Sequence, residues 1–117
     1  PFDNKMTLLE LTGKSLLKFF DYMASYMEPM SSGVRLTIKD GAVSSVTLNG
    51  KTIDPDAIYK VCTIDYLVES GRYAFDENIY RLDSVDYIYD LFCNQVKKAA
   101  ARGEQVQASI DDRVSEI

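Results

Sequence analysis

The feature that most constrains the fold is a strict alternation of apolar and polar side chains over residues 34–39. This period of two is typical of a β-strand that buries one face. Asp40-Gly41 favours a tight turn, and a second alternating run over residues 45–48 leads into Asn49-Gly50. The pattern predicts two half-buried antiparallel strands joined as a hairpin, so the chain must build at least one sheet.

Two other segments show apolar residues at helical spacing. The first is predicted to form a helix over residues 13–27, capped by Thr12. The second is predicted to form a helix over 84–102, capped by Asp83 or Ser84 and ended by Gly103. We expect the second helix to pack against the strands that carry Leu36 and Val46. Its expected buried stripe consists of Ile88, Leu91, Phe92, Val96, Ala99 and Ala100.

The remaining segments complete an α+β prediction. Strands are expected over residues 6–11, 51–53, 58–63 and 106–110, a short helix begins near Ile64, and residues 71–80 are interpreted as loop. The 117 residues are predicted to form a single domain, 1–117, with a mixed or antiparallel sheet packed by two main helices.

Charge and composition exclude several classes of function. The net charge of −5 argues against binding to a nucleic-acid backbone, and no apolar run is long enough to span a membrane. The chain has no histidine, which removes His-dependent triads and the usual binuclear metal sites. Cys62 and Cys93 lie 31 residues apart, so they form no zinc motif, and two buried thiols are favoured over a disulfide.

The residues alone point to no catalytic centre. Gly13-Lys14-Ser15 is similar to the end of a phosphate-binding loop but lacks the upstream glycines, and the paired carboxylates lie in expected turns. Phe2 and Tyr66 stand at the ends of expected strands, where aromatic rings either stack on a planar ligand or simply pack at the rim. The residues by themselves leave both interpretations open.

Five ordered stretches resemble the motifs of one known family. They are Pro1-Phe2-Asp3-Asn4 with Leu11-Thr12-Gly13, Ser32-Gly33-Val34-Arg35, residues 49–61 from Asn-Gly-Lys to Tyr-Lys-Val, Thr63-Ile64-Asp65-Tyr66-Leu67 and, more weakly, Asp112-Arg113-Val114. In this order they are similar to the C-terminal domain of the 5′-nucleotidases, a secreted family that includes UDP-sugar hydrolases and 2′,3′-cyclic nucleotide phosphodiesterases. The resemblance covers nearly the whole chain.

The resemblance implies a domain that recognises the substrate and does not itself catalyse. Two aromatic rings of that domain enclose the nucleobase, and their motif positions fall on Phe2 and Tyr66, with Asp65 where a base-contacting Asn is common. It also implies a nucleotide or nucleoside ligand and an extracytoplasmic location. No cofactor is expected in this chain; divalent ions such as zinc or manganese are expected in an N-terminal metallophosphoesterase domain that performs the hydrolysis.

Two departures from the family pattern matter. Arg72 stands where the family's glycine-rich segment has an Asp that contacts ribose, and a guanidinium cannot accept hydrogen bonds from hydroxyl groups. The family's Asn-Gly-Gly-x-Arg motif, whose Arg helps hold phosphate, precedes the position of Pro1. We therefore expect an N-terminally truncated domain without its catalytic partner. The alternative is a degenerate structural or interaction module with the same fold; whether the whole protein is an enzyme is left open.

Overall fold

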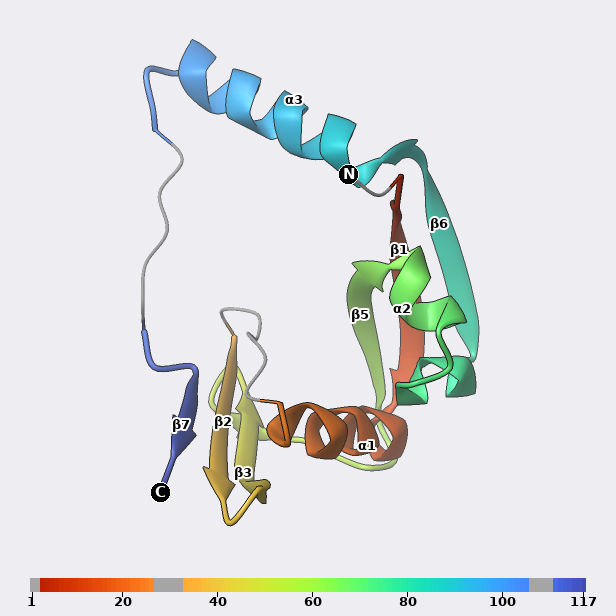
Figure 1. Cartoon of the computed structure of the whole chain (residues 1–117), viewed down its shortest axis with the longest axis vertical. Helices are drawn as coiled ribbons and strands as arrows, with labels where there is room; N and C mark the ends of the chain where they lie inside the picture. The colour runs from red at the N-terminus through yellow and green to blue at the C-terminus, as the bar shows by residue number, and fades with distance from the viewer. Residues whose placement is uncertain (1–2, 27–32, 106–110) are drawn as a thin grey trace.

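The computed structural model describes residues 3–26, 33–105 and 111–117, which form two sheets and three α-helices (Figure 1). Sheet A has the order β5-β1-β6, and sheet B has the order β4-β3-β2-β7. Their strands are β1 (Lys5–Thr12), β5 (Ile58–Ile64) and β6 (Tyr80–Tyr87), and β4 (Lys51–Thr52), β3 (Ala42–Leu48), β2 (Val34–Lys39) and β7 (Val114–Glu116). The helices are α1 (Gly13–Ala24), α2 (Asp65–Glu69) and α3 (Ile88–Ala101), with a 3₁₀ turn η1 (Ala74–Glu77).

The predicted hairpin is confirmed as β2 and β3 of sheet B. Its turn residues Asp40 and Gly41 have φ angles of 53° and 77°, the left-handed pair that a two-residue hairpin turn requires. Asn49 and Gly50 repeat this geometry between β3 and β4. β7 pairs with β2 in parallel, so sheet B is mixed, whereas sheet A is antiparallel. The predicted α+β class with a mixed or antiparallel sheet is confirmed.

The start of α1 is fixed by the loop that precedes β5. The Thr12 side chain accepts a hydrogen bond from the Ser15 N–H, as predicted for its N-cap. The Gly13 N–H donates to the Ala57 carbonyl at 2.8 Å and the Lys14 N–H to the Pro55 carbonyl at 3.0 Å. Backbone carbonyls therefore occupy the donors that a phosphate-binding loop would present, which removes that interpretation of Gly13-Lys14-Ser15.

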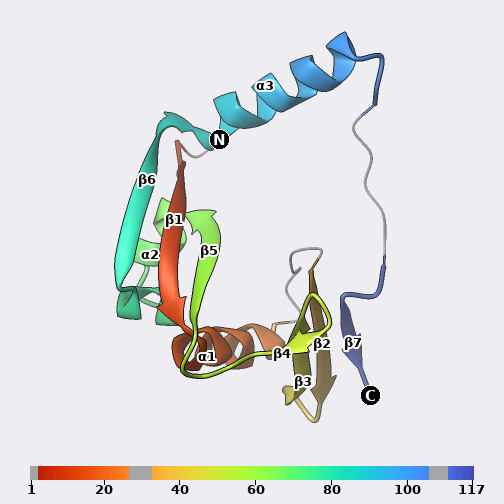
Figure 2. The same ribbon diagram turned by 180° about the vertical axis from the view of Figure 1, so that it is seen from behind.

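α1 lies below sheet A and beside sheet B, and it joins two hydrophobic clusters (Figures 1 and 2). The larger cluster is built around Leu16, Phe20 and Leu36, and the smaller one around Leu9 and Phe75. The half-buried side chains of Phe19 and Val61 pack against both clusters. Within the part of the chain that the structure describes, Phe19 of α1 and Val61 of β5 thus link the two clusters. The helix ends at Ala24, short of the predicted residue 27, and Met27 lies outside the described residues.

Two predictions about residues 71–102 are wrong. Residues 80–87, expected as loop and helix start, form strand β6, so α3 begins only at Ile88. The Ser84 hydroxyl, interpreted as a helix cap, instead accepts the Met6 N–H at 3.0 Å and donates to the Asp86 carbonyl. A polar side chain at an irregular strand pairing thus has the same sequence signature as a helix cap.

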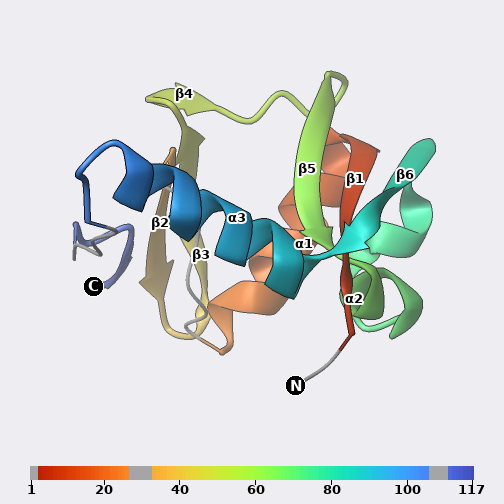
Figure 3. The ribbon, with the colours of Figure 1, turned by 90° about the horizontal axis from the view of Figure 1, so that it is seen from above.

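α3 does not pack on the strands that carry Leu36 and Val46. Figure 1 shows α3 at the end of the molecule opposite α1, and Figure 3, seen from above, shows it crossing the molecule. Only Ala99 of the helix is buried. Phe92 and Val96 of the expected stripe are 59% and 38% exposed. The segment forms a helix, as predicted, but the predicted packing of its apolar side chains against the strands of Leu36 and Val46 is wrong.

Three smaller predictions have different outcomes. Gly103 follows α3 with a φ of 73°, which confirms it as the helix terminator. Both thiols are free, and Cys62 is exposed while Cys93 is half-buried, so the expected burial of both is wrong. The strand expected over residues 106–110 lies outside the described residues.

Candidate functional site

The candidate site lies at the end of sheet A where β1 begins and β5 ends. The antiparallel register places Met6 opposite Ile64, so the chain enters β1 and leaves β5 at the same end of the sheet. β6 reaches this end as well, because Lys5 lies opposite Tyr87 and the Ile88 N–H donates to the Asn4 carbonyl at 2.8 Å. We call this region the Met6 end of sheet A. The segments flanking two of the family-like motifs therefore meet there.

Asp65 and Tyr66 open α2 at the Met6 end. The Asp65 carboxylate accepts a hydrogen bond from the Tyr66 N–H at 2.8 Å, which fixes the first residue of the helix. The Tyr66 side chain is 57% exposed, so its ring faces are available to a planar ligand. Phe2, the other ring expected at this site, lies outside the described residues. Its position relative to Tyr66 remains a prediction.

Arg72 follows α2 and interacts in the direction of α1. Its backbone N–H donates to the Ser70 hydroxyl at 3.4 Å. A hydrogen bond with Tyr26 raises the pKa of Tyr22 on α1 above its ordinary value, and the positive charge of Arg72 acts in the opposite direction. Arg72 is thus close enough to α1 to act on the Tyr22 phenol. Among the described residues, neither of these interactions brings the Arg72 side chain to the Tyr66 ring.

Three ion-pair and hydrogen-bond contacts form a network that links α2, β6 and β1. The Arg81 guanidinium lies 3.0 Å from the Asp83 carboxylate and 3.2 Å from the Glu69 carboxylate at the end of α2. The fully buried Thr7 donates its hydroxyl to Asp83 at 2.8 Å. The Arg81 guanidinium and this hydroxyl lower the pKa of Asp83 below its ordinary value. The ion pair between Arg81 and Glu69 ties the end of α2 to β6, and Asp83 is held in its carboxylate form at neutral pH.

An aromatic cluster between α1 and the loop after α2 was missed from the sequence. Phe19 stacks on Phe75 with ring centroids 4.8 Å apart, and Tyr73 meets Tyr22 edge-on at 5.0 Å. Tyr73 and Phe75 belong to a segment that the sequence analysis interpreted as loop. The only sequence signal for their burial was the spacing of two between the two aromatic residues. The cluster anchors η1, and with it the chain leading into β6.

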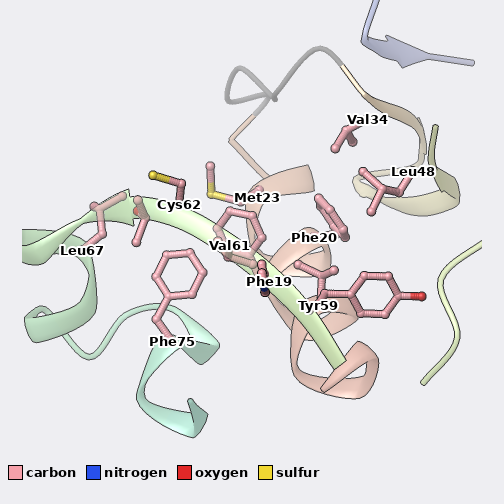
Figure 4. A pocket seen from close by; sticks show the side chains of 13 residues that line it. Phe19, Phe20, Met23, Val34, Leu48, Tyr59, Val61, Cys62, Leu67 and Phe75 are labelled. Carbon is pink, nitrogen blue, oxygen red and sulfur yellow. The ribbon is translucent and has the colours of Figure 1, made fainter. Parts of the chain in front are cut away.

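A groove of about 470 Å³ lies between α1 and β5 (Figure 4). Its floor is apolar and includes Phe19, Phe20 and Met23 of α1. Five consecutive residues of β5, 59–63, form one wall, and Leu48 of β3 contributes to the opposite side. The sequence predicted the apolar stripe of α1 but not that part of it stays open. The groove offers an apolar surface, but its lining residues form no cluster of polar or charged side chains.

The described residues offer no metal centre. Among residues 3–26, 33–105 and 111–117, no three His, Cys, Asp or Glu side chains are grouped so that they could hold a metal ion. The chain also lacks histidine altogether. The metal ions that the family resemblance implies are expected in a separate N-terminal domain and not among these residues. Over the same ranges, no helix has the length and apolar character needed to cross a membrane.

Residues 1–77 match a family model described as 5′-nucleotidase, C-terminal domain. Among curated proteins, the chain is 30% identical over 78 residues to a 5′-nucleotidase of Vibrio vulnificus (strain CMCP6) and 25% identical over 76 residues to Protein UshA of Escherichia coli (strain K12). Each match covers 61% of this chain but only 14% of the relative. The chain therefore corresponds to a small part of these proteins.

Solved structures share the fold over the whole chain. The 5′-nucleotidase precursor from Thermus thermophilus aligns with a TM-score of 0.80 and 21% identity, covering 100% of this chain and 26% of that one. The sulfate thiohydrolase SoxB of the same organism aligns with a TM-score of 0.64 and 16% identity, covering 97% and 22%. These similarities establish the fold, and the second was found in an enzyme whose name describes a different reaction.

Proposed function

Because the chain belongs to the family of 5′-nucleotidase C-terminal domains, we propose that it recognises the nucleoside part of a nucleotide for a 5′-nucleotidase-like hydrolase. In this proposal the domain binds and orients the substrate, and a separate N-terminal metallophosphoesterase domain supplies the divalent metal ions and the hydrolysis. The whole protein then dephosphorylates nucleotides outside the cytoplasm, as part of nucleotide catabolism.

The observation that carries the proposal is the exposed ring of Tyr66 at the Met6 end of sheet A. Tyr66 follows directly from β5, and the chain that leads back to Phe2 enters β1 at the same end, opposite Ile64. Two rings on either side of a nucleobase would each contribute about 1–3 kcal/mol of stacking, by analogy with base–aromatic contacts elsewhere. Asp65 supplies a carboxylate beside the base.

We expect the Met6 end to bind the nucleoside part of a nucleotide and not its phosphate group. Asp3, Asp65 and Asp86 give acidic character to the residues around the Met6 end, with Lys5 as a neighbouring cation. Phosphate recognition in the full protein therefore has to come from outside these residues. Stacking alone, after the entropy cost of association, supports affinities of roughly millimolar to high micromolar strength.

A titration with adenosine, followed by NMR chemical shifts of the backbone amides, tests the proposal. We expect shifts at Asp65 and Tyr66, and a Kd about tenfold weaker in Tyr66→Ala, because about 1.4 kcal/mol of stacking is lost. Tyr80→Ala is the matched control, since Tyr80 lies opposite Glu10 at the other end of the same sheet. Shifts confined to residues far from Phe2, Asp65, Tyr66 and Arg72 would reject the site.

The second candidate is a degenerate module that keeps the fold without binding a nucleotide. It is favoured by Arg72, which stands where the family has a ribose-contacting Asp and which acts on Tyr22 of α1. The sequence of the full-length protein separates the two candidates. An Asp-x-His and Asn-His-Glu metallophosphoesterase pattern before residue 1 supports the hydrolase, and its absence supports the module.

A further inference from the structure

Three residues lie in a row across the Met6 end of sheet A. Lys5 of β1 lies opposite Tyr87 of β6. On the other side of β1, the last pair in the register is Met6 with Ile64, and Ile64 is extended, with a φ of −112° and a ψ of 150°. Asp65 therefore takes the next position, beside Lys5. Opposite residues of antiparallel strands have Cα atoms about 4.5–5.5 Å apart, so the row from Asp65 through Lys5 to Tyr87 is about 10 Å long.

The Lys5 side chain lies on the face of sheet A that α2 covers. Lys5 and the buried Leu9 are four positions apart along β1, so their side chains point to the same face. Val68 of α2 packs with Leu9 on that face. The pKa of Asp83 is lowered first by its hydrogen bond with Arg81, and the positive charge of Lys5 also contributes. Both observations place the Lys5 ammonium group on the side of the sheet where α2 begins.

Two exposed tyrosines stand at the ends of this row. Tyr66 follows Asp65 directly in the chain and is 57% exposed, and Tyr87 is 44% exposed. An aromatic ring offers a flat apolar surface on which a planar ligand stacks. In the row between the two tyrosines, Lys5 supplies N–H donors and Asp65 supplies carboxylate oxygens, which only accept. This combination suits a planar ring that carries both acceptors and donors on one edge.

The polar groups of Lys5 and Asp65 are available to a ligand. One oxygen of the Asp65 carboxylate accepts the Tyr66 N–H at 2.8 Å. Within the part of the chain that the structure describes, no other partner is found for this carboxylate, and Lys5 forms no ion pair. An anion bound at Lys5 would lie beside the Asp65 carboxylate and be repelled by it. The pair therefore favours a neutral ligand over a free phosphate.

Guanine matches this pair of side chains better than adenine does. The pairing edge of guanine carries the carbonyl oxygen O6 next to two parallel donors, N1–H and N2–H. A carboxylate accepts both donors at once, and a lysine donates to O6. The pairing edge of adenine carries a single donor, N6–H, next to the acceptor N1, which cannot bond to a carboxylate. Guanine thus forms one hydrogen bond more than adenine at the same two side chains.

We propose that the Met6 end of sheet A selects guanine nucleotides over adenine nucleotides, and that the Asp65 carboxylate determines this preference. Lys5 donates to the O6 atom of the base, and Tyr66 and Tyr87 provide the flanking rings. The inference rests on the proposed function, since a nucleobase must bind at this end. It adds the identity of the base and assigns roles to Lys5 and Tyr87, which belong to no site expected from the sequence.

Titrations of the 117-residue chain with GMP, IMP and AMP, followed by NMR chemical shifts of the backbone amides, test the proposal. The three nucleotides share the ribose and the phosphate, so differences in Kd report the base. We expect GMP to bind about tenfold more tightly than AMP, which corresponds to about 1.4 kcal/mol. IMP lacks the N2 amino group and should bind more weakly than GMP, because the carboxylate then has one donor in place of two.

Three variants separate the roles of the residues. Asp65→Asn exchanges one acceptor oxygen for a donor, so the ratio of the AMP Kd to the GMP Kd should fall from about ten to about two or less. Asp86→Asn is the matched control, since Asp86 is an exposed carboxylate at the same end but has no partner in the register of β1 and β6. It should leave the ratio unchanged. Tyr87→Ala should weaken GMP and AMP alike, by about threefold to tenfold.

The outcomes distinguish this inference from the proposed function. Equal Kd values for GMP and AMP, with shifts at Asp65 and Tyr66, would overturn the guanine preference and leave the proposed function standing. A preference for GMP that survives Asp65→Asn would overturn the role of this carboxylate. No shifts at Asp65 and Tyr66 with any of the three nucleotides would reject the proposed function, and the inference with it.

Discussion

The Ser15 hydroxyl on α1 donates a hydrogen bond to the Glu77 carboxylate in η1, across 62 positions of sequence. Lys18, one turn further along α1, contacts the other oxygen of the same carboxylate at 2.7 Å. Glu77 therefore fastens the turn before β6 to the helix that joins the two hydrophobic clusters. The contacts with Lys18 and Ser15 lower the pKa of Glu77 below its ordinary value of 4.5.

This lowered pKa predicts a pH-dependent contribution to stability. An acid whose pKa is depressed on folding stabilises the protein fully above its unfolded value, here about 4.5, and loses this contribution as the pH falls through the folded value. Glu77→Gln should lower the melting temperature at pH 7, and the difference from the parent should shrink towards pH 3. Asp76→Asn, at the neighbouring exposed carboxylate, is the control. A difference that stays constant with pH would contradict this role for Glu77.

The close approach of the 54–57 loop to Gly13 gives a second prediction. A Cβ atom at position 13 would lie 1.8 Å from the Asp54 carbonyl oxygen, which belongs to the backbone and cannot rotate away. Gly13→Ala should therefore lower the free energy of unfolding by about 1–3 kcal/mol or more, although alanine normally favours a helix. Urea denaturation measures this. Lys14→Ala, at the exposed next position, should change it by less than about 0.5 kcal/mol. Equal changes in unfolding free energy for the two variants would mean that the 54–57 loop moves aside to accommodate the Cβ atom.

The local elements of this fold could be predicted because their signals are local. Alternation over residues 34–39, the left-handed turn at Asp40-Gly41 and the Thr12 cap each depend on a few neighbouring residues. β6 was missed because its pairing with β1, seventy or more positions away, decides its conformation. Its Ser84 hydroxyl then resembled a helix cap. Tertiary pairing overrode a plausible local pattern there.

The candidate site could be predicted only as far as its motifs. Tyr66 and Asp65 were found through the family resemblance, and the register between Met6 and Ile64 gives them a common end of the sheet with the start of β1. The proximity of Arg72 to Tyr22 depends on how η1 docks on α1, which no local pattern encodes. The open groove is likewise a property of assembly, since the same apolar period describes a helix face that is covered and one that is not.

The different environments of two phenylalanines give a third prediction. Phe75 is 1% exposed and stacks on Phe19, whereas Phe92 of α3 lies largely in solvent. In the 117-residue chain, Phe75→Ala should cost about 3–5 kcal/mol of unfolding free energy and Phe92→Ala less than about 0.5 kcal/mol. Urea denaturation followed by circular dichroism compares them. Similar losses would show that α3 is packed in solution, against the arrangement described here.

The last prediction concerns catalysis by this chain alone. In the proposed division of roles, hydrolysis depends on metal ions held by a separate domain, and the described residues provide no group of three His, Cys, Asp or Glu side chains to hold a metal. The 117-residue chain should therefore release no phosphate from AMP above the buffer blank, with or without added Mn²⁺ or Zn²⁺. The full-length protein under the same conditions is the positive control. Phosphate release by the 117-residue chain that EDTA abolishes would place a metal-dependent catalytic centre within these residues and refute the division of roles proposed here.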